Sequence, residues 1–505
     1  MLKTFIPGLA LFLLSQAYAA GTASESSLWG SVGELWSPAS RLSDFSSAGY
    51  AGGRREILDY PVRTSVKDHG AKGDGLTDDT VAFREAIRAV EEPGAILVPA
   101  GRYLLTDVVE INRSGVVLRG EGPEKSLLII PKPLSAIHPR ANVDAVKSAY
   151  SFSGGFLSMK GSDAGPRLGE VIEPAKRGSF TLKVFFTNIP KPGDRIRLIM
   201  NDPPDHSLLR HLHGDLLDPG TDTSNLKHPV DWAATITEVK DGVIRLDCPL
   251  RVDVRPEWKP EIFLLSPTLQ GSGIENLGIE FPGNPKQPHL QEEGYNAIEF
   301  KGAVDCWIRN VTVTDADNGA IIGGSRFCTV DGFTVRAAKR TGLTGHHAMW
   351  VTGRTQDSLF VRFRCDTTYV HDLTVEGYAN GNVFASGSGV TINCDHHRNA
   401  PYDNLFTDID VGDPRRLFES SGREDRGPHS GARTTVWRLR GRGKFPELPS
   451  PKDWPLINVV GFGDYPVSRD PGGSWIEPGN DSFSPRNLWQ AQVERRRKDE
   501  AASVH

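Results

Sequence analysis

Histidine is concentrated in one part of this chain. Six of the 14 histidines fall between residues 346 and 429. Imidazole is the side chain whose unperturbed pKa lies closest to neutral pH, so it can either donate or accept a proton in a catalytic step. Three of these residues are our predicted catalytic histidines: His347, His371 and His397.

Arginine and aromatic residues are interleaved with these histidines. The planar guanidinium group binds carboxylate or sulfate through paired hydrogen bonds, and aromatic rings can stack on the faces of sugars. A surface of this kind suits an acidic polysaccharide. The residues that we expect to bind substrate are Trp350, Arg362, Arg364, Tyr402, His429 and Arg433.

The chemistry that fits this composition best is β-elimination of a uronate. That reaction needs a group that neutralises the carboxylate, a base that removes the proton on the adjacent carbon, and an acid that protonates the departing oxygen. Arginine can neutralise but stays charged, so it is a poor base. The candidates are Arg362, Arg364 or Arg398 as the neutralising group, His371 or His397 as the base, and the other histidine, or Tyr402, as the acid.

The segment Asn393–Asn399 reads Asn-Cys-Asp-His-His-Arg-Asn and is expected to form a loop between stacked strands. Loops often carry functional residues, which favours a role for His397 and Arg398. If the segment were instead a strand, His396 and His397 would face opposite sides and only one of them could act.

A metal site is the alternative interpretation of the same residues. Asp395, His371 and either His396 or His397 could form a mixed ligand set, and Asp-rich turns could hold calcium. No spacing here matches a known metal motif, and calcium prefers oxygen ligands. We therefore expect catalysis without a required metal and keep calcium as the open alternative.

A six-residue pattern recurs in the part of the chain that carries these residues. Positions one, four and six are apolar, and position three is Asn, Gly or Asp, residue types that tolerate a bend. Starts are 22 to 40 residues apart, which is typical of a solenoid with loops inserted at fixed places. The copies are Ile274–Ile279, Ile308–Val313, Val330–Val335, Val370–Val375 and Phe406–Val411.

This repeat predicts an all-β fold, a right-handed parallel β-helix. A β-sandwich or propeller is the alternative, but the short turns of antiparallel hairpins are largely missing. The pattern also predicts that His371 points outward and aligns, on neighbouring coils, with three other second-position residues: Arg309, Asp331 and Thr407.

Before the repeats, residues 80–92 show helical periodicity, with Phe83, Ala86, Ile87 and Val90 on one face. Asp78 or Asp79 can cap this helix. Short strands are expected at 95–98, 103–105, 108–111 and 116–118. Between them and the repeats, residues 165–265 contain an Asp-Gly hairpin turn, which predicts a small antiparallel β insertion.

The stretch Asp68–Thr80, Asp-His-Gly-Ala-Lys-Gly-Asp-Gly-Leu-Thr-Asp-Asp-Thr, resembles the opening of the pectate-lyase-like superfamily in its polygalacturonase- and rhamnogalacturonase-like version. The resemblance implies a right-handed parallel β-helix whose N-terminal end is capped by the helix at 80–92. The carboxylate and Gly-His-Gly signatures of the hydrolase branch are absent or only approximate. We therefore expect a polysaccharide lyase, with a glycoside hydrolase on a pectin-like polymer or a non-catalytic carbohydrate-binding solenoid as alternatives.

Composition limits the cellular context and partners. The chain has 505 residues, 38% hydrophobic and 24% charged, which favours a folded soluble protein over disorder. Its net charge of −5 gives no basic surface for nucleic acid. Residues 1–19 combine Lys3, a short apolar run and Ala17-Tyr18-Ala19, which predicts a cleaved signal peptide, secretion and no membrane anchor. We expect a monomer.

The predicted domain organisation has four parts. A signal peptide covers residues 1–19 and an irregular lead-in covers 20–60. The parallel β-helix covers 61–440 and includes the insertion at 165–265. A wrapping, partly flexible tail covers 441–505.

Overall fold

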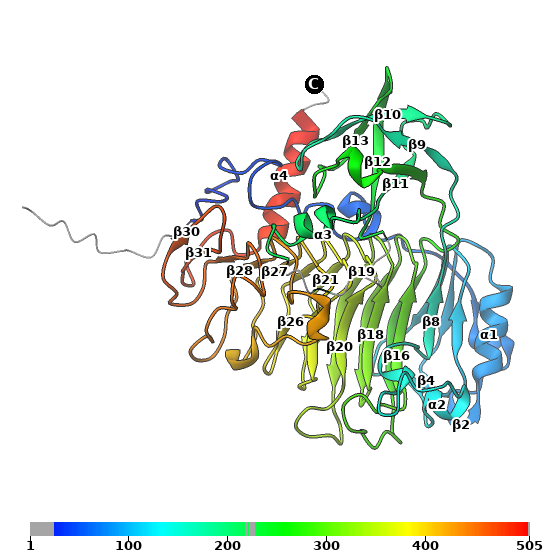
Figure 1. The fold of residues 1–505 in the computed structure, drawn as a ribbon. Helices are drawn as coiled ribbons and strands as arrows, with labels where there is room; N and C mark the ends of the chain where they lie inside the picture. Colours follow the sequence, from blue (N-terminus) through cyan, green and yellow to red (C-terminus); the bar gives the residue numbers. More distant parts are fainter. Residues whose placement is uncertain (1–24, 218–220, 222–227, 503–505) are drawn as a thin grey trace, which may run out of the picture.

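The computed structural model describes residues 25–217, 221 and 228–502, so the predicted signal peptide lies outside the described residues. Most of the chain forms a parallel β-helix, in which the strands of one coil pair in parallel with those of the next (Figure 1). The predicted fold class is therefore confirmed. Within the described ranges, no helix is long and apolar enough to cross a membrane.

The larger sheet of the solenoid has 18 strands. Its neighbours pair in parallel except β30 and β31, which are antiparallel. The strands are β1 Val62–Ser65, β2 Asp74–Asp78, β3 Gly94–Val98, β4 Gly101–Leu104, β6 Val116–Gly120, β7 Ser126–Ile129, β15 Gly273–Glu280, β17 Trp307–Thr314, β19 Thr329–Arg336, β21 Leu359–Val361, β22 Arg364–Cys365, β24 Val383–Ala385, β25 Ser388–Gly389, β27 Leu405–Thr407, β28 Thr435–Trp437, β29 Asn458–Val460, β30 Ser468–Arg469 and β31 Trp475–Glu477.

A second sheet has seven strands, and neighbouring strands are again parallel. Figure 1 shows β16, β18 and β20 side by side near its middle. In spatial order the strands are β5 Val109–Ile111, β8 Leu157–Lys160, β16 Asn296–Lys301, β18 Asn318–Gly323, β20 His347–Thr352, β23 His371–Val375 and β26 Cys394–His396.

The six-residue repeat sets the register of the larger sheet. Ile274 of β15 pairs with Ile308 of β17, which pairs with Val330 of β19. The third position turns the chain with a positive φ, which Asn, Asp and Gly adopt at lower cost than other residues. This conformation occurs in four of the five copies, at Asn276, Asn310, Gly332 and Asp408.

The copy at Val370–Val375 does not belong to that ladder. Its strand β23 lies in the seven-stranded sheet, where His371 pairs with His347 of β20. Its third residue, Asp372, does not take the left-handed conformation. A six-residue apolar pattern fits a strand in either sheet, so the pattern alone could not choose between them. The predicted alignment of His371 is therefore wrong for Arg309, Asp331 and Thr407.

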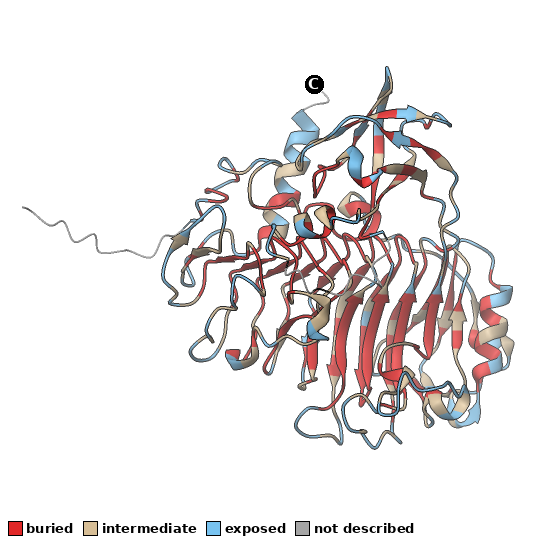
Figure 2. Ribbon diagram, viewed as in Figure 1, coloured by how far each residue is buried: buried red, intermediate tan, exposed pale blue. Residues whose placement is uncertain are grey.

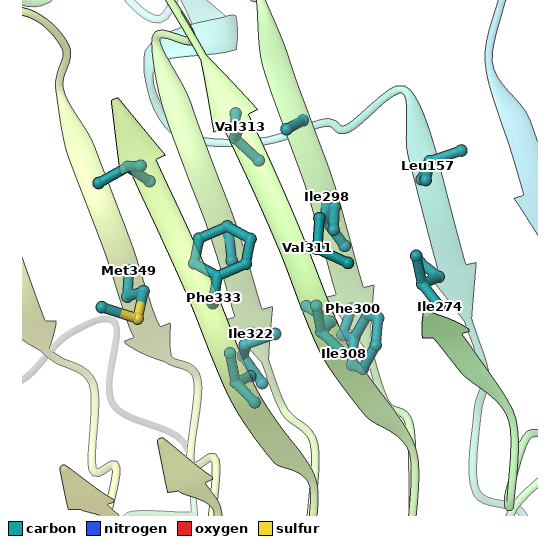
Figure 3. Packing of buried hydrophobic residues seen from close by; sticks show 14 of the residues in the cluster. Leu157, Ile274, Ile298, Phe300, Ile308, Val311, Val313, Ile322, Phe333 and Met349 are labelled. Carbon is teal, nitrogen blue, oxygen red and sulfur yellow. The ribbon is translucent and has the colours of Figure 1, made fainter. Parts of the chain in front are cut away.

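The interior of the coils is apolar and tightly stacked. Figure 2 shows the solenoid strands mostly buried, and Figure 3 shows aliphatic and aromatic side chains from facing strands packed together. Phe360, Phe384 and Phe406 stack on successive coils, with ring centroids 4.6 and 5.0 Å apart. Parallel strands about 4.8 Å apart bring equivalent side chains into such stacks.

The helix α1, Thr80–Ala89, covers the first coils, and Phe83, Ala86 and Ile87 are buried. Asp79 occupies the position before the helix, but its carboxylate accepts hydrogen bonds from the amides of Lys72 and Gly73 rather than from the helix. The carboxylate of Asp78 accepts from the Thr80 amide instead. Short helices lie at α2 Leu134–Ile137 and α3 Ser207–Leu212, and 3-10 turns lie at Tyr50–Gly53, Val66–His69, Ala149–Ser151, Pro256–Trp258, Pro414–Arg416 and Glu424–Arg426.

The predicted antiparallel insertion is a closed six-stranded barrel with its own apolar core. Its hairpin between β12 and β13 turns at Asp241 and Gly242, both with positive φ, as the twist of such a hairpin requires. The strands are β9 Arg167–Val171, β10 Thr181–Phe186, β11 Arg195–Met200, β12 Val230–Lys240, β13 Val243–Leu246 and β14 Glu261–Leu264.

The lead-in and the C-terminal segment meet beside the larger sheet. Strands β29 and β31 extend that sheet beyond residue 440, where the sequence placed the end of the solenoid. The helix α4, Leu488–Ala502, was not predicted, because its polar sequence has no apolar face. The Gln492 side chain in α4 exchanges hydrogen bonds with the backbone of Ser43 and Phe45 in the lead-in.

Candidate active site

Polar residues form a column at the start of four adjacent strands in the seven-stranded sheet. Asn296, Asn318, His347 and His371 are paired in register. The Asn318 amide donates to the Asn296 side-chain oxygen at 2.8 Å. On β20 and β23 the column continues with His347 and His371 in place of asparagines. The centroids of these two rings are 4.7 Å apart. His371 was expected on the surface, but neighbouring loops and rings bury it.

Asp395 connects the histidines. Its Oδ2 atom lies 3.1 Å from Nδ1 of His371 and 2.9 Å from Nδ1 of His397. Its Oδ1 atom accepts a hydrogen bond from the Ser421 amide at 2.9 Å. Because an ionised carboxylate only accepts hydrogen bonds, both imidazoles carry a proton on Nδ1 and turn their Nε2 atoms away from Asp395.

The charges of this group follow from its burial and pairing. Burial alone would raise the pKa of Asp395, but the adjacent His397 and His371 outweigh it and hold that pKa well below its ordinary value. Burial would likewise lower the pKa of His397, but Asp395 outweighs it and raises that pKa to about 9. At neutral pH the site therefore holds an ionised carboxylate beside an imidazolium.

A hydroxyl relay orients His347 in the same way. The Thr374 hydroxyl lies 3.3 Å from Oδ2 of Asp395 and 2.9 Å from Nδ1 of His347. Thr374 must donate to the carboxylate, so it accepts from His347, whose Nε2 then carries a free lone pair. Burial, together with the nearby histidines, lowers the pKa of His347 well below its ordinary value, which keeps it neutral. Trp350 stacks on its ring at a centroid distance of 4.4 Å.

Two more histidines complete the group, which we call the imidazole cluster: His289, His346, His347, His371 and His397. His289 comes from the segment 282–295 and is exposed, whereas His346 is buried beside His347. The Nε2 atoms of His289 and His346 are 3.1 Å apart. His289 was missed because a Pro-rich segment outside the repeats has no periodicity that would place it.

Glu376 and Arg426 also border the cluster and were not predicted as site residues. Glu376 accepts from the Trp350 indole at 3.1 Å and pairs with Arg426 at 3.2 Å. Burial raises the pKa of Glu376, and the nearby His397 and Arg426 oppose that shift. Arg426 is therefore held by Glu376 at the border of the cluster.

The segment Asn393–Asn399 is partly a strand and not the predicted loop. Cys394–His396 form β26, so successive side chains alternate between the two faces. His396 points into the core, where its ring lies 3.9 Å from Trp454 between centroids and burial lowers its pKa to about 3. Of the two histidines, only His397 reaches the site, as expected for a strand.

Arg398 and His429 lie close to the cluster but are used to hold a loop. The Arg398 guanidinium donates to the carbonyls of Gly422 and Gly427, and one of its nitrogens lies 3.3 Å from Nε2 of His429. His429 Nδ1 in turn contacts the Ser421 carbonyl. These contacts fix the segment that borders His397, which is a positioning role.

Four predicted substrate-binding residues are not brought to the cluster. Arg362 and Arg364 lie on the larger sheet and form exposed ion pairs with Asp331 and Asp366. Tyr402 is 1% exposed and packs in the core beneath the barrel. Arg433 is also buried and pairs with a carboxylate there, that of Asp403.

Two groups in the cluster have ligand atoms close enough to share a metal ion. The first is His289, His346 and His371, and the second is His371, Asp395 and His397, the set predicted from sequence. Nitrogen donors dominate both groups, which does not suit calcium.

Comparisons with known proteins agree with the motif at residues 68–80. The curated proteins that match short stretches include the following two. A glucan 1,3-beta-glucosidase of Cochliobolus carbonum is 41% identical over 58 residues, which are 9% of this chain and 7% of that protein. The plasmin and fibronectin-binding protein A of Streptococcus pneumoniae is 31% identical over 110 residues, 19% of this chain and 15% of that protein. The matches thus span only a small part of each relative.

Solved structures with a similar fold include the tailspike protein gp49 from Pseudomonas phage LKA1. Its TM-score is 0.43 and its sequence identity 12%, and the match covers 79% of this chain and 70% of that one. The family 28 exopolygalacturonase of Yersinia enterocolitica has a TM-score of 0.36 and 11% identity, and the match covers 81% of this chain and 67% of that one. In sequence, residues 63–132 match the family described as rhamnogalacturonase A/epimerase, pectate lyase-like, so the predicted resemblance is confirmed for the first coils of the solenoid.

Proposed function

We propose that this protein cleaves an acidic, uronate-containing polysaccharide by β-elimination at the imidazole cluster. The observation that carries the proposal is the arrangement around Asp395. One buried carboxylate orients His371 and His397 directly and His347 through Thr374. A set of imidazoles with fixed proton positions is what a reaction with two proton transfers requires.

The two proton carriers differ in charge. His397 is an imidazolium and can give a proton to the departing glycosidic oxygen. His347 is neutral and keeps a lone pair on Nε2, so it can take the proton from the carbon next to the carboxyl group. The electron pair of that C–H bond forms the new C=C bond, and the glycosidic C–O bond breaks toward the oxygen that His397 protonates.

Arg426 is the arginine placed to meet the uronate carboxylate. It is paired with Glu376 at 3.2 Å, at the border of the cluster. A substrate carboxylate that takes over this guanidinium would be neutralised next to the proton carriers.

Hydrolysis is less well supported, because the carboxylates of Asp317 and Asp395 are already engaged. Asp317 is buried and accepts from the amides of Gly294 and Tyr295. Asp395 holds two imidazoles, as described above. Neither carboxylate is left to act as a nucleophile or to activate water.

The test is near-ultraviolet absorbance of the purified protein with a panel of uronate polysaccharides. Unsaturated uronate ends absorb there, so a rise supports elimination and identifies the polymer. New reducing ends without a rise would replace the lyase with a hydrolase. Retention on the polysaccharide without either product would make the protein a binding solenoid.

Secretion as a monomer belongs to the same proposal, since an enzyme that cleaves such a polysaccharide would meet it outside the cell. Mass spectrometry of the exported protein should find the chain starting at residue 20, and light scattering should give the mass of one chain. Retention of the full chain inside the cell would contradict export.

A further inference from the structure

Three imidazoles of the cluster converge on one point. The Nε2 atoms of His289 and His346 are 3.1 Å apart, and the ligand atoms of His289, His346 and His371 all lie within 4.8 Å of one another. In a tetrahedral zinc site with Zn–N bonds of about 2.0–2.1 Å, ligand nitrogens are about 3.3–3.4 Å apart. We propose that His289, His346 and His371 bind one zinc ion.

His371 supplies the second reason. Its Nδ1 faces Asp395 at 3.1 Å, which leaves Nε2 as the atom that can bind a ligand. That Nε2 atom is buried and has no hydrogen-bond partner among the described residues. A buried polar atom without a partner costs about 1–3 kcal/mol, and a metal ion bound there would supply the missing partner.

The carboxylates behind the histidines match the outer shell of a metal site. Metal-bound histidines usually present their other nitrogen to a carboxylate, which fixes the ring and strengthens the ligand. Asp395 lies behind His371 in this way, whereas Glu292, 3.6 Å from Nδ1 of His346, is near that ring but makes no hydrogen bond to it. Both carboxylates are buried, so they also offset the charge of a dication.

The ligand types select the ion. Three imidazole nitrogens suit zinc and similar transition metals and do not suit calcium or magnesium. The alternative set of His371, Asp395 and His397 is disfavoured, because both imidazole Nδ1 atoms are committed as donors to Asp395. Because His289 is exposed, the solvent side of the site is where a fourth ligand such as water would bind.

Metal binding does not depend on the proposed elimination. If that reaction holds, the open position of the zinc ion could take the uronate carboxylate beside His397 and act as a Lewis acid. Zinc binding would also tie the segment 282–295, through His289, to the seven-stranded sheet.

The experiment uses the full-length protein, stripped with a chelator and then given Zn²⁺, with bound metal measured by mass spectrometry. Co²⁺ in place of Zn²⁺ reports the coordination by visible absorption. We expect one ion per chain. His289→Ala changes an exposed side chain, so it should fold normally and yet weaken binding at least tenfold. His138→Ala, another exposed histidine outside the cluster, is the matched control and should bind as the wild type does.

Two further variants separate the possible outcomes. His397→Gln should keep the metal, and loss of metal in this variant would overturn the ligand set in favour of the group around Asp395. Wild-type protein without a stoichiometric ion, or equal binding by His289→Ala, would overturn the site itself. Because metal content is measured without substrate, a protein that binds zinc but forms no unsaturated product would refute only the proposed elimination.

Discussion

His347 and His371 occupy the same position on neighbouring coils, and their rings stack with centroids 4.7 Å apart and planes inclined by 26°. Parallel strands in register force this spacing, because equivalent residues follow one another at about 4.8 Å. Asp395, on the strand that follows that of His371 in the sheet, orients both rings. The solenoid repeat itself thus builds an ordered array of imidazoles.

The first prediction concerns the proton donor. His397→Gln removes the imidazolium but keeps a side chain that can hydrogen-bond to Asp395. A lost acid–base group costs about 10²–10⁴-fold in rate, and we expect a loss of that size in kcat, measured by near-ultraviolet absorbance. His138→Gln is the control and should keep the wild-type rate. A His397→Gln enzyme within threefold of wild type would remove His397 from the mechanism.

The second prediction tests the relay through Thr374. Thr374→Val keeps the shape of the side chain but removes the hydroxyl between His347 and Asp395. Loss of one orienting hydrogen bond should lower kcat about tenfold, equivalent to about 1.4 kcal/mol, with little change in KM. Thr374→Ser restores the hydroxyl and should recover most of the rate. Equal rates for the Val and Ser variants would show that the relay has no role.

The third prediction concerns the stacked phenylalanines inside the coils. Phe384 lies between Phe360 and Phe406, and all three are fully buried. Phe384→Ala should lower the free energy of unfolding by about 3–5 kcal/mol, because it leaves a cavity between rigid coils. Denaturant unfolding measures this value. Phe185→Ala, at a residue 60% exposed in the barrel, should change it by less than about 0.5 kcal/mol.

The fourth prediction concerns stability in acid. Burial lowers the pKa of His213 in the folded protein from 6.5 to about 4. The folded state therefore disfavours the charged form, so its stability is complete above pH about 6.5 and falls as the pH drops toward 4. A shift of this size amounts to about 3 kcal/mol for a fully buried group.

The measurement is thermal unfolding of wild type and His213→Gln between pH 4 and 7. Glutamine keeps a hydrogen-bond donor for the Leu209 carbonyl, which His213 contacts at 2.9 Å, but does not titrate. We expect the variant to lose less stability than wild type on acidification. Parallel curves for the two proteins would show that another group is responsible.

The six-residue repeat is sufficient to predict the parallel β-helix. Apolar positions one, four and six with a bend at position three define a strand and its turn, and for that reason the repeat aligns Ile274, Ile308 and Val330 correctly. The helix at Phe83 and the Asp241-Gly242 hairpin are likewise set by neighbours in sequence. Such features depend on residues within a few positions of one another.

The tertiary structure decides which residues form the site. His371 enters the seven-stranded sheet because of the lengths of the loops before it, which the six-residue pattern does not record. His289 reaches His346 across 57 residues of sequence. Tyr402 is buried beneath a barrel whose strands end more than 130 residues earlier.

The sequence by itself therefore determined the β-helix, its capping helix, its antiparallel insertion and the concentration of histidines on late coils. Only the tertiary structure decided that Asp395 orients His371 and His397, and that Arg362 and Arg364 lie on another sheet. The physical reason is range: backbone conformation and burial periodicity are set by adjacent residues, whereas contacts across coils depend on the length and path of every loop between them.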